Sequence, residues 1–188
     1  MKNFEEMGFT PGILKAINEL GFEEPMPVQK KVIPLMLADQ CDIIALAQTG
    51  TGKTAAFGLP LVQTTDPESG KIQTVILCPT RELCMQITSD LADYSKYTGK
   101  LKILAVYGGA SIDNQIRALK AGVHIIVATP GRLIDLIGRR AAKLGSVNTV
   151  ILDEADEMLN MGFLDSINEI LEEVPEDRRT LLFSATMS

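Results

Sequence analysis

A run of small and basic residues between an apolar segment and a helical pattern is the first feature of the chain that suggests chemistry. The run is Gln48-Thr49-Gly50-Thr51-Gly52-Lys53-Thr54, and it follows the apolar residues 43–47. Backbone amides in such a loop turn toward an anion, the dipole of the following helix adds to their field, and a lysine supplies a point charge. Thr54 offers a hydroxyl of the kind that Mg²⁺ binds beside a phosphate. The run therefore predicts a phosphate-binding loop, although Ala47 stands where the usual pattern begins with glycine.

An acidic run, Asp153-Glu154-Ala155-Asp156, follows the apolar residues 150–152. Beside a phosphate loop, one carboxylate of such a run can hold Mg²⁺ through water, and the next can orient or deprotonate the attacking water. We therefore predict Asp153 as a magnesium ligand with Thr54, and Lys53, Asp153 and Glu154 as the catalytic residues. Alone, such a run is more often a solvated helix start, so this prediction depends on the phosphate loop.

Polar residues also follow the other apolar segments. They are Pro79-Thr80-Arg81-Glu82, Gly108-Gly109, Thr129-Pro130-Gly131-Arg132 and Ser184-Ala185-Thr186. The first three groups provide backbone amides, hydroxyls and two arginines, which suit the phosphates of a nucleic-acid strand contacted without reading its bases. Ordinary turns, and a structural ion pair for either arginine, remain open as alternatives. The hydroxyls of Ser184 and Thr186 are predicted to bond the neighbouring carboxylates.

These candidates need a scaffold that brings several strand ends together. Six short apolar segments have the pattern of buried strands: Ile43–Ala47, Thr74–Cys78, Ile103–Tyr107, Ile125–Ala128, Val150–Leu152 and Thr180–Phe183. Five segments between them have helical spacing: Thr54–Val62, Glu82–Tyr97, Ile112–Lys120, Arg132–Arg139 and Leu164–Glu173. This alternation predicts an α/β fold with a mostly parallel sheet flanked by helices on both faces, where ligands lie beyond the carboxyl ends of the strands.

A helical leader, residues 1–38, precedes a core of residues 39–188. Thr10 and Pro11 are predicted to open a helix over Gly12–Leu20, with Thr10 as the N-cap. Pro27 is predicted to open a second helix that runs to Leu37.

Composition narrows the class of protein. The chain has 188 residues, 46% of them hydrophobic and 22% charged, which indicates one globular domain. A net charge of −6 argues against a diffusely basic nucleic-acid binder, so any such contact must be local. The apolar runs fall far short of the ~20 residues of a membrane span, and the first residues lack a signal-peptide core, so we expect a cytoplasmic protein with no membrane partner. Three cysteines and a single histidine show no zinc-binding pattern.

In chain order, the motifs resemble those of the DEAD-box family of ATP-dependent RNA helicases. The matching segments are Phe4, Gly21 to Pro25 with Gln29, Ala47 to Thr54, Pro79 to Leu83, Gly108-Gly109, Thr129 to Arg132, Asp153 to Asp156 and Ser184 to Thr186. The resemblance is to the first of the two RecA-like domains of that family, a P-loop NTPase fold. It implies ATP and Mg²⁺ as cofactors, RNA as a backbone-bound partner, and coupling of the two through Asp156, Ser184 and Thr186.

The resemblance also assigns an adenine site. Gln29 is similar to the glutamine whose amide recognises adenine, Phe22 would lie against the base, Phe4 would support the pocket, and Glu24 belongs to the same motif. Met26 replaces the usual Ser or Thr and removes a capping oxygen, a loss of about 0.5–2 kcal/mol in typical helices. The adenine contact is therefore expected to be looser.

By the same resemblance, the chain ends before a second RecA-like domain, and we expect a monomer that is nearly inactive without that domain. A DNA-translocating helicase of related fold and a non-catalytic binding module are the alternatives. Gln29 and Asp156 favour the RNA enzyme over the first. The intact Lys53, Thr54, Asp153 and Glu154 weigh against the second.

Overall fold

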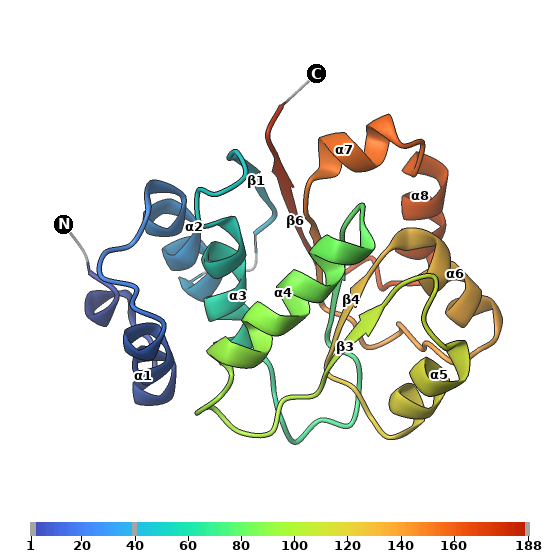
Figure 1. Cartoon of the computed structure of the whole chain (residues 1–188), viewed down its shortest axis with the longest axis horizontal. Helices are drawn as coiled ribbons and strands as arrows, with labels where there is room; N and C mark the ends of the chain where they lie inside the picture. Colours follow the sequence, from blue (N-terminus) through green and yellow to red (C-terminus); the bar gives the residue numbers. More distant parts are fainter. Residues whose placement is uncertain (1–2, 39–40, 187–188) are drawn as a thin grey trace.

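A six-stranded parallel sheet organises the chain, whose computed structural model describes residues 3–38 and 41–186 (Figure 1). The strands are β1 Ile43–Leu46, β2 Thr74–Leu77, β3 Ile103–Val106, β4 Ile125–Ala128, β5 Thr149–Leu152 and β6 Arg179–Ser184. They lie in the order β1-β6-β5-β2-β4-β3, and every neighbouring pair is parallel. The predicted α/β fold is confirmed, and each predicted strand lies within one residue of its observed bounds.

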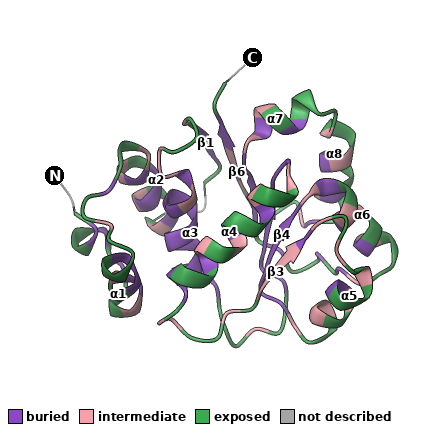
Figure 2. Cartoon of the chain, viewed as in Figure 1, coloured by how far each residue is buried: buried purple, intermediate pink, exposed green. Residues whose placement is uncertain are grey.

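Helices cover both faces of the sheet. One face carries α1 Pro11–Glu19, α2 Pro27–Ala38, α3 Lys53–Thr64 and α4 Arg81–Tyr94, and the other carries α5 Ile112–Lys120, α6 Pro130–Gly138, α7 Ala155–Asn160 and α8 Leu164–Glu172. A short 3₁₀ helix, Glu5–Met7, precedes α1. Figure 2 shows the buried residues on the central strands and on the helix sides that face them. Within the described ranges, no helix combines the length and apolarity needed to cross a bilayer.

β1 corrects the prediction that the strands are apolar and buried on both faces. Ile43 and Ala45 are buried beneath the α2 and α3 side, but Ile44 and Leu46 are 64% and 59% exposed. The reason is position, because β1 is an edge strand and only its Ile43 and Ala45 side belongs to the core beneath α2 and α3. An apolar segment alone does not say whether its strand is central or at an edge.

Hydroxyl side chains begin two of the helices that follow strands. Thr80 Oγ1 accepts from the Leu83 amide at 3.2 Å at the start of α4, and Ser111 Oγ does the same for Asn114 at 3.4 Å at the start of α5. Thr10 stands at the N-cap position of α1, but its hydroxyl makes no capping bond. Its amide instead donates to Gln63 Oε1 at 2.9 Å, so a link to α3 fixes this residue. The predicted N-cap position of Thr10 is confirmed, with Pro11 in the first turn, but the side-chain capping bond is absent.

The segment before β1 packs on the core. Arg179, buried at the start of β6, donates to the carbonyls of Cys41, Met36 and Leu35 at 2.9, 3.0 and 3.2 Å. The last two carbonyls lie in the final turn of α2, where a cation is favourable. The predicted boundary at residues 38 and 39 meets residues 39–40, which lie outside the described part, as do Met187 and Ser188.

Candidate functional site

The carboxyl ends of the strands border a cavity of about 570 Å³. It is lined by most of the predicted nucleotide-site residues: Phe22, Glu24, Gln29, Thr49, Gly50, Gly52, Lys53, Thr54, Asp153 and Glu154. Ala47, Gln48 and Thr51 line a neighbouring cavity beside β1 instead. The phosphate loop therefore separates two hollows, and only the first brings the lysine and the carboxylates together.

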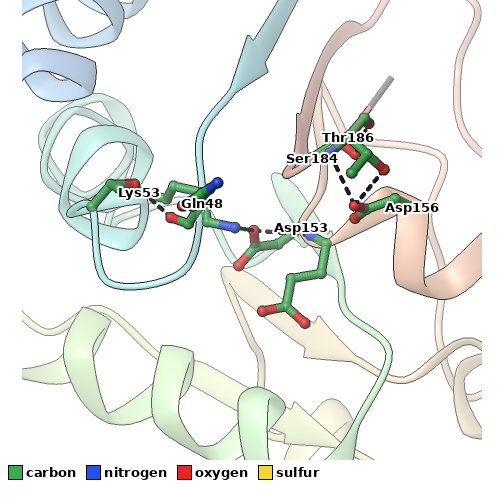
Figure 3. A network of polar contacts seen from close by, with 8 residues as sticks. Gln48, Lys53, Asp153, Asp156, Ser184 and Thr186 are labelled. Atoms are coloured by element: carbon green, nitrogen blue, oxygen red, sulfur yellow. Dashed lines mark hydrogen bonds and ion pairs between the residues drawn. The ribbon is translucent and has the colours of Figure 1, made fainter. Parts of the chain in front are cut away.

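Lys53 and Asp153 form the charged centre of this cavity (Figure 3). Lys53 Nζ lies 3.6 Å from Asp153 Oδ1, and the two residues are 7% and 2% exposed. Within the described ranges Lys53 Nζ has no hydrogen-bond partner, although a buried ammonium normally makes several such bonds. Burial raises the pKa of the Asp153 carboxyl, and the Lys53 charge opposes that rise. A buried cation with open donor capacity at a phosphate loop fits an anionic ligand.

Glu154 has a strained backbone conformation. Its φ of 51° is left-handed, which costs of order 1–3 kcal/mol for a residue other than glycine. Its amide donates to Asp153 Oδ1 at 3.0 Å, and its side chain lines the cavity beside that carboxylate. The backbone thus turns two consecutive carboxylates to one site.

Gln29 connects α2 to the phosphate loop. Its Oε1 accepts from the Met26 amide at 2.8 Å and its Nε2 donates to the Gly52 carbonyl at 3.1 Å. The first bond is the glutamine half of a capping box, and it persists although Met26 supplies no oxygen for the other half. A primary amide has two donor hydrogens and two acceptor lone pairs, so one of each remains for an adenine edge.

Aromatic residues form the apolar wall of the cavity. Phe22 lies in the wall, stacks on buried Phe4 with 6.3 Å between ring centroids, and meets Tyr94 edge-on at 6.4 Å. Phe4 does not line the cavity, but its buried ring packs against Phe22 and supports the cavity wall. The lining residues Leu83, Asp90 and Tyr94 of α4 were not predicted. They are seven and four residues apart, which places them on one face of the helix. This spacing is the sequence signal from which they could have been predicted.

The end of β6 bonds to the acidic run. Thr186 donates to Asp156 Oδ2 through its amide at 3.0 Å and its hydroxyl at 2.9 Å, and Ser184 Oγ donates to the Thr186 carbonyl at 2.5 Å (Figure 3). Slight burial raises the pKa of Asp156, but hydrogen bonds from Thr186 and its neighbours outweigh this and leave that pKa low. This contact gives the acidic run a direct connection to the last described residues.

The predicted RNA-contacting residues lie at the ends of β2, β3 and β4. The Arg81 guanidinium lies over the Tyr107 ring at 5.2 Å, and a side chain at Gly109 would come within 3.5 Å of its Nη1. Arg132 Nη1 donates to the Ala110 carbonyl at 2.9 Å and to Gln115 Oε1 at 3.1 Å. Arg132 thus holds the glycine turn, while Arg81 forms no ion pair with a described carboxylate. Of the other predicted RNA-contacting residues, Gly108, Gly109 and Gly131 are exposed, and Thr80 and Thr129 are partly exposed. Pro79 and Pro130 are buried, so the structure does not offer their side chains to an RNA strand.

Comparison with known protein families shows to which family the chain belongs. Residues 26–188 match the sequence profile of the family described as DEAD/DEAH box helicase. The chain belongs to that family. It is also similar in structure to a DEAD box protein from Methanococcus jannaschii, with a TM-score of 0.95 and 47% identity, over 99% of this chain and 50% of the other.

Curated DEAD-box relatives match the whole chain but are much longer. The ATP-dependent RNA helicase CshA of Listeria monocytogenes is 54% identical over 100% of this chain and 36% of its own length. The DEAD-box ATP-dependent RNA helicase CshA of Bacillus subtilis is 53% identical over 98% of this chain and 37% of its length. The chain thus spans about a third of the curated relatives it matches, in their N-terminal part.

The DEAD-box site fits ATP and Mg²⁺. Lys53 would hold the phosphate chain with the loop amides, while the Thr54 hydroxyl and the Asp153 carboxylate would hold the metal. Within the described ranges, no three His, Cys, Asp or Glu residues gather as a metal group. Mg²⁺ therefore needs further oxygens from phosphate and water, which is how this ion usually binds beside a nucleotide.

Gly52→Ala is expected to lower ADP affinity at least about tenfold more than Gly50→Ala does. Both glycines are left-handed, at φ of 83° and 80°, so both variants carry the ~1–2 kcal/mol cost of a side chain there. Only at Gly52 would the new Cβ clash with Gln29 Nε2, whereas nothing lies within 4 Å of a Cβ at Gly50. Calorimetric titration of both variants measures the difference. Equal losses would show that the contact with Gln29 does not shape the loop.

Proposed function

We propose that this chain is the ATP-binding and RNA-binding domain of a cytoplasmic, monomeric ATP-dependent RNA helicase. With Mg²⁺ it binds ATP in the cavity beside the phosphate loop, and it holds the RNA backbone at the ends of β2, β3 and β4. Joined to a second RecA-like domain, it uses hydrolysis to separate short RNA duplexes. The observation that carries the proposal is the buried Lys53 ammonium, which has no hydrogen-bond partner within the described ranges and faces Asp153 at 3.6 Å.

The chemistry follows from the positions of the residues. Lys53 and the loop amides bind and orient the phosphate chain. Thr54 and Asp153 would hold Mg²⁺, which would supply positive charge against the transferred phosphoryl group. Glu154 lines the same cavity beside Asp153, where it accepts the proton of the attacking water and orients that water. Asp156 and Thr186 connect this site to the end of β6, which supports their role in coupling hydrolysis to domain movement.

A non-catalytic binding module remains the alternative from a different class. A module that only binds nucleotide has no need for a strained glutamate beside the magnesium ligand, and the φ of 51° at Glu154 therefore favours the enzyme.

Gln29→Ala is expected to lower the preference for ADP over GDP about tenfold, because it removes the donor and acceptor that match the adenine edge. The variant also loses the bonds to Met26 and Gly52, which loosens the loop for every nucleotide. The ratio of the two affinities, measured by calorimetry, isolates the effect on the base. An unchanged ratio would contradict the adenine assignment.

Arg81→Ala is expected to weaken RNA binding equally for oligouridylate and mixed sequences and to reduce the salt slope of log K by about 1. Arg81 lies on the exposed face over Tyr107, so its loss removes a phosphate contact and no base readout. Fluorescence anisotropy at several salt concentrations measures both quantities. Arg139→Ala is the matched control, because Arg139 is paired with Asp135 at 2.8 Å. A base preference that changes with Arg81→Ala would contradict backbone-only recognition.

A further inference from the structure

A second cavity, here called the far-edge cavity, lies at the amino ends of the strands, opposite the nucleotide site. Its volume is about 550 Å³, and its walls come from the segments before β2, β4 and β5. These strands are neighbours in the sheet, so segments far apart in sequence meet at this edge, in the lower part of Figure 1. The segments place four cationic side chains around one hollow: Lys71, Lys120, Arg140 and Lys143.

The charge of the far-edge cavity is uncompensated. The whole protein has 24 acidic residues and 18 basic ones, yet among the described residues no Asp or Glu lines this cavity. Within the described ranges none of its four cations forms an ion pair, whereas Lys53, Lys96 and Arg139 each pair with a carboxylate. Cations gathered without a counter-charge repel one another, and this repulsion is relieved when an anion binds.

Arg140 is held in a strained conformation at the rim. Its φ of 57° is left-handed, and within the described ranges the other residues with positive φ are glycines, apart from Glu154 of the nucleotide site. A glycine at 140 would remove the strain. The conformation belongs to the end of α6, where the Arg140 amide donates to the Ile137 carbonyl at 2.8 Å and the Ala141 amide donates to the Leu136 carbonyl at 2.9 Å. This turn fixes the backbone that carries the guanidinium at the rim of the cavity.

The shape of the cavity selects among anions. Its floor contains the apolar, buried side chains of Ile72 and Val123, and the charged side chains surround it on the exposed rim. A guanidinium binds two phosphate oxygens at once, and lysine ammonium groups bind phosphate as point charges. Four cations exceed what a single phosphate needs, so the cavity suits several linked phosphates.

We propose that the far-edge cavity is a second phosphate-binding site, which takes consecutive phosphate groups of an RNA strand or of a free polyphosphate. It is separate from the nucleotide site. The phosphate chemistry stands without the proposed helicase function, and only RNA as the source of the phosphates rests on that function.

Amide NMR of the chain with ADP and Mg²⁺ in excess tests the site, because the nucleotide cavity is then occupied. The signals of Gly70 and Gly145 report on the far-edge cavity, and those of Gly50 and Gly52 report on the nucleotide loop. Tripolyphosphate and a short oligouridylate are added separately, with polyglutamate as a third titrant. Shifts at Gly70 and Gly145 with oligouridylate support an RNA source, and shifts with tripolyphosphate alone support the site with a free polyphosphate as its source.

Charge variants test whether the four cations bind the ligand. Lys120→Glu with Lys143→Glu is expected to weaken binding at least about tenfold, because two attractive charges become repulsive. The control pair, Lys100→Glu with Arg117→Glu, changes the net charge by the same amount at residues that do not line the cavity. It is expected to weaken ligand binding less than about threefold. Arg140→Gly is expected to weaken binding without lowering the melting temperature, since glycine accepts the left-handed conformation.

Three results would overturn the proposal. The first is the absence of shifts at Gly70 and Gly145 with both phosphate ligands. The second is an equal loss of affinity in the control pair, which would show that the net charge of the protein attracts the ligand and that the cavity does not bind it specifically. The third is equal or stronger binding of polyglutamate, which would identify a surface for acidic peptides.

Discussion

In the presence of RNA, the 188-residue chain alone is expected to hydrolyse ATP at least ~10³-fold more slowly than the same chain joined to a second RecA-like domain. Charge that develops on the transferred phosphoryl group needs a cation on the side away from the phosphate loop. An arginine finger that supplies such a cation is typically worth ~10³–10⁵ in rate. In this chain Lys53 supplies a cation on the side of the phosphate loop, and no arginine lines the cavity.

The arginines of the chain are all placed by the structure, and none of them lines the nucleotide cavity. They are Arg81, Arg117, Arg132, Arg139, Arg140, Arg178 and Arg179. Arg132, Arg178 and Arg179 are engaged with carbonyls of this domain. Arg139 is paired with Asp135, and Arg140 lies at the far edge of the sheet. A positive group must therefore come from elsewhere.

Single-turnover and steady-state ATPase assays of the purified chain, with and without RNA, measure this deficit. The chain is still expected to bind ADP, which separates a missing catalytic group from a misfolded protein. Adding a second RecA-like domain in trans at high concentration is expected to restore part of the rate, because a linker mainly raises effective concentration. Robust RNA-stimulated hydrolysis by the chain alone, abolished by Lys53→Ala, would contradict the two-domain account.

The strands and most helices could be predicted because their side chains pack against a core. β4 and α5 match their predicted bounds, since burial on two faces or on one helical stripe leaves a clear periodicity in the sequence. A local stretch of sequence does not show which helices and strands become neighbours in the fold. The exposure of Ile44 and Leu46 depends on which strand lies at the edge, and the tie between Thr10 and Gln63 depends on how α1 meets α3.

The candidate site was predictable where a short segment carries the chemistry, as in the phosphate loop and the acidic run. It was not predictable where separate elements meet. Asp90 and Tyr94 line the cavity because α4 packs beside α3, and the amide of Gln29 reaches Gly52 only after α2 has docked. The far-edge cavity is of the same kind, because its cations come from three separate segments that the strand order brings together.

Glu154→Gln is expected to lower the hydrolysis rate of the two-domain protein about 10²–10⁴-fold while leaving ATP affinity within about threefold. Glutamine keeps the length and shape of the side chain but cannot accept a proton. Glu154 is a neighbour of Asp153 in the cavity and is not predicted to hold the metal, so its loss removes a step of the reaction and spares the phosphate contacts of Lys53.

Glu157→Gln is the matched control. It replaces a carboxylate by an amide in the same way, but Glu157 is exposed on α7 and does not line the cavity. Its rate is expected to equal that of the unchanged protein. Single-turnover hydrolysis measures the chemical step, and calorimetry measures ATP binding. If Glu154→Gln lost affinity as well as rate, its carboxylate would belong to the metal or phosphate contacts. If it kept the normal rate, the proton would be taken by another group, and the strain at φ 51° would need a different explanation.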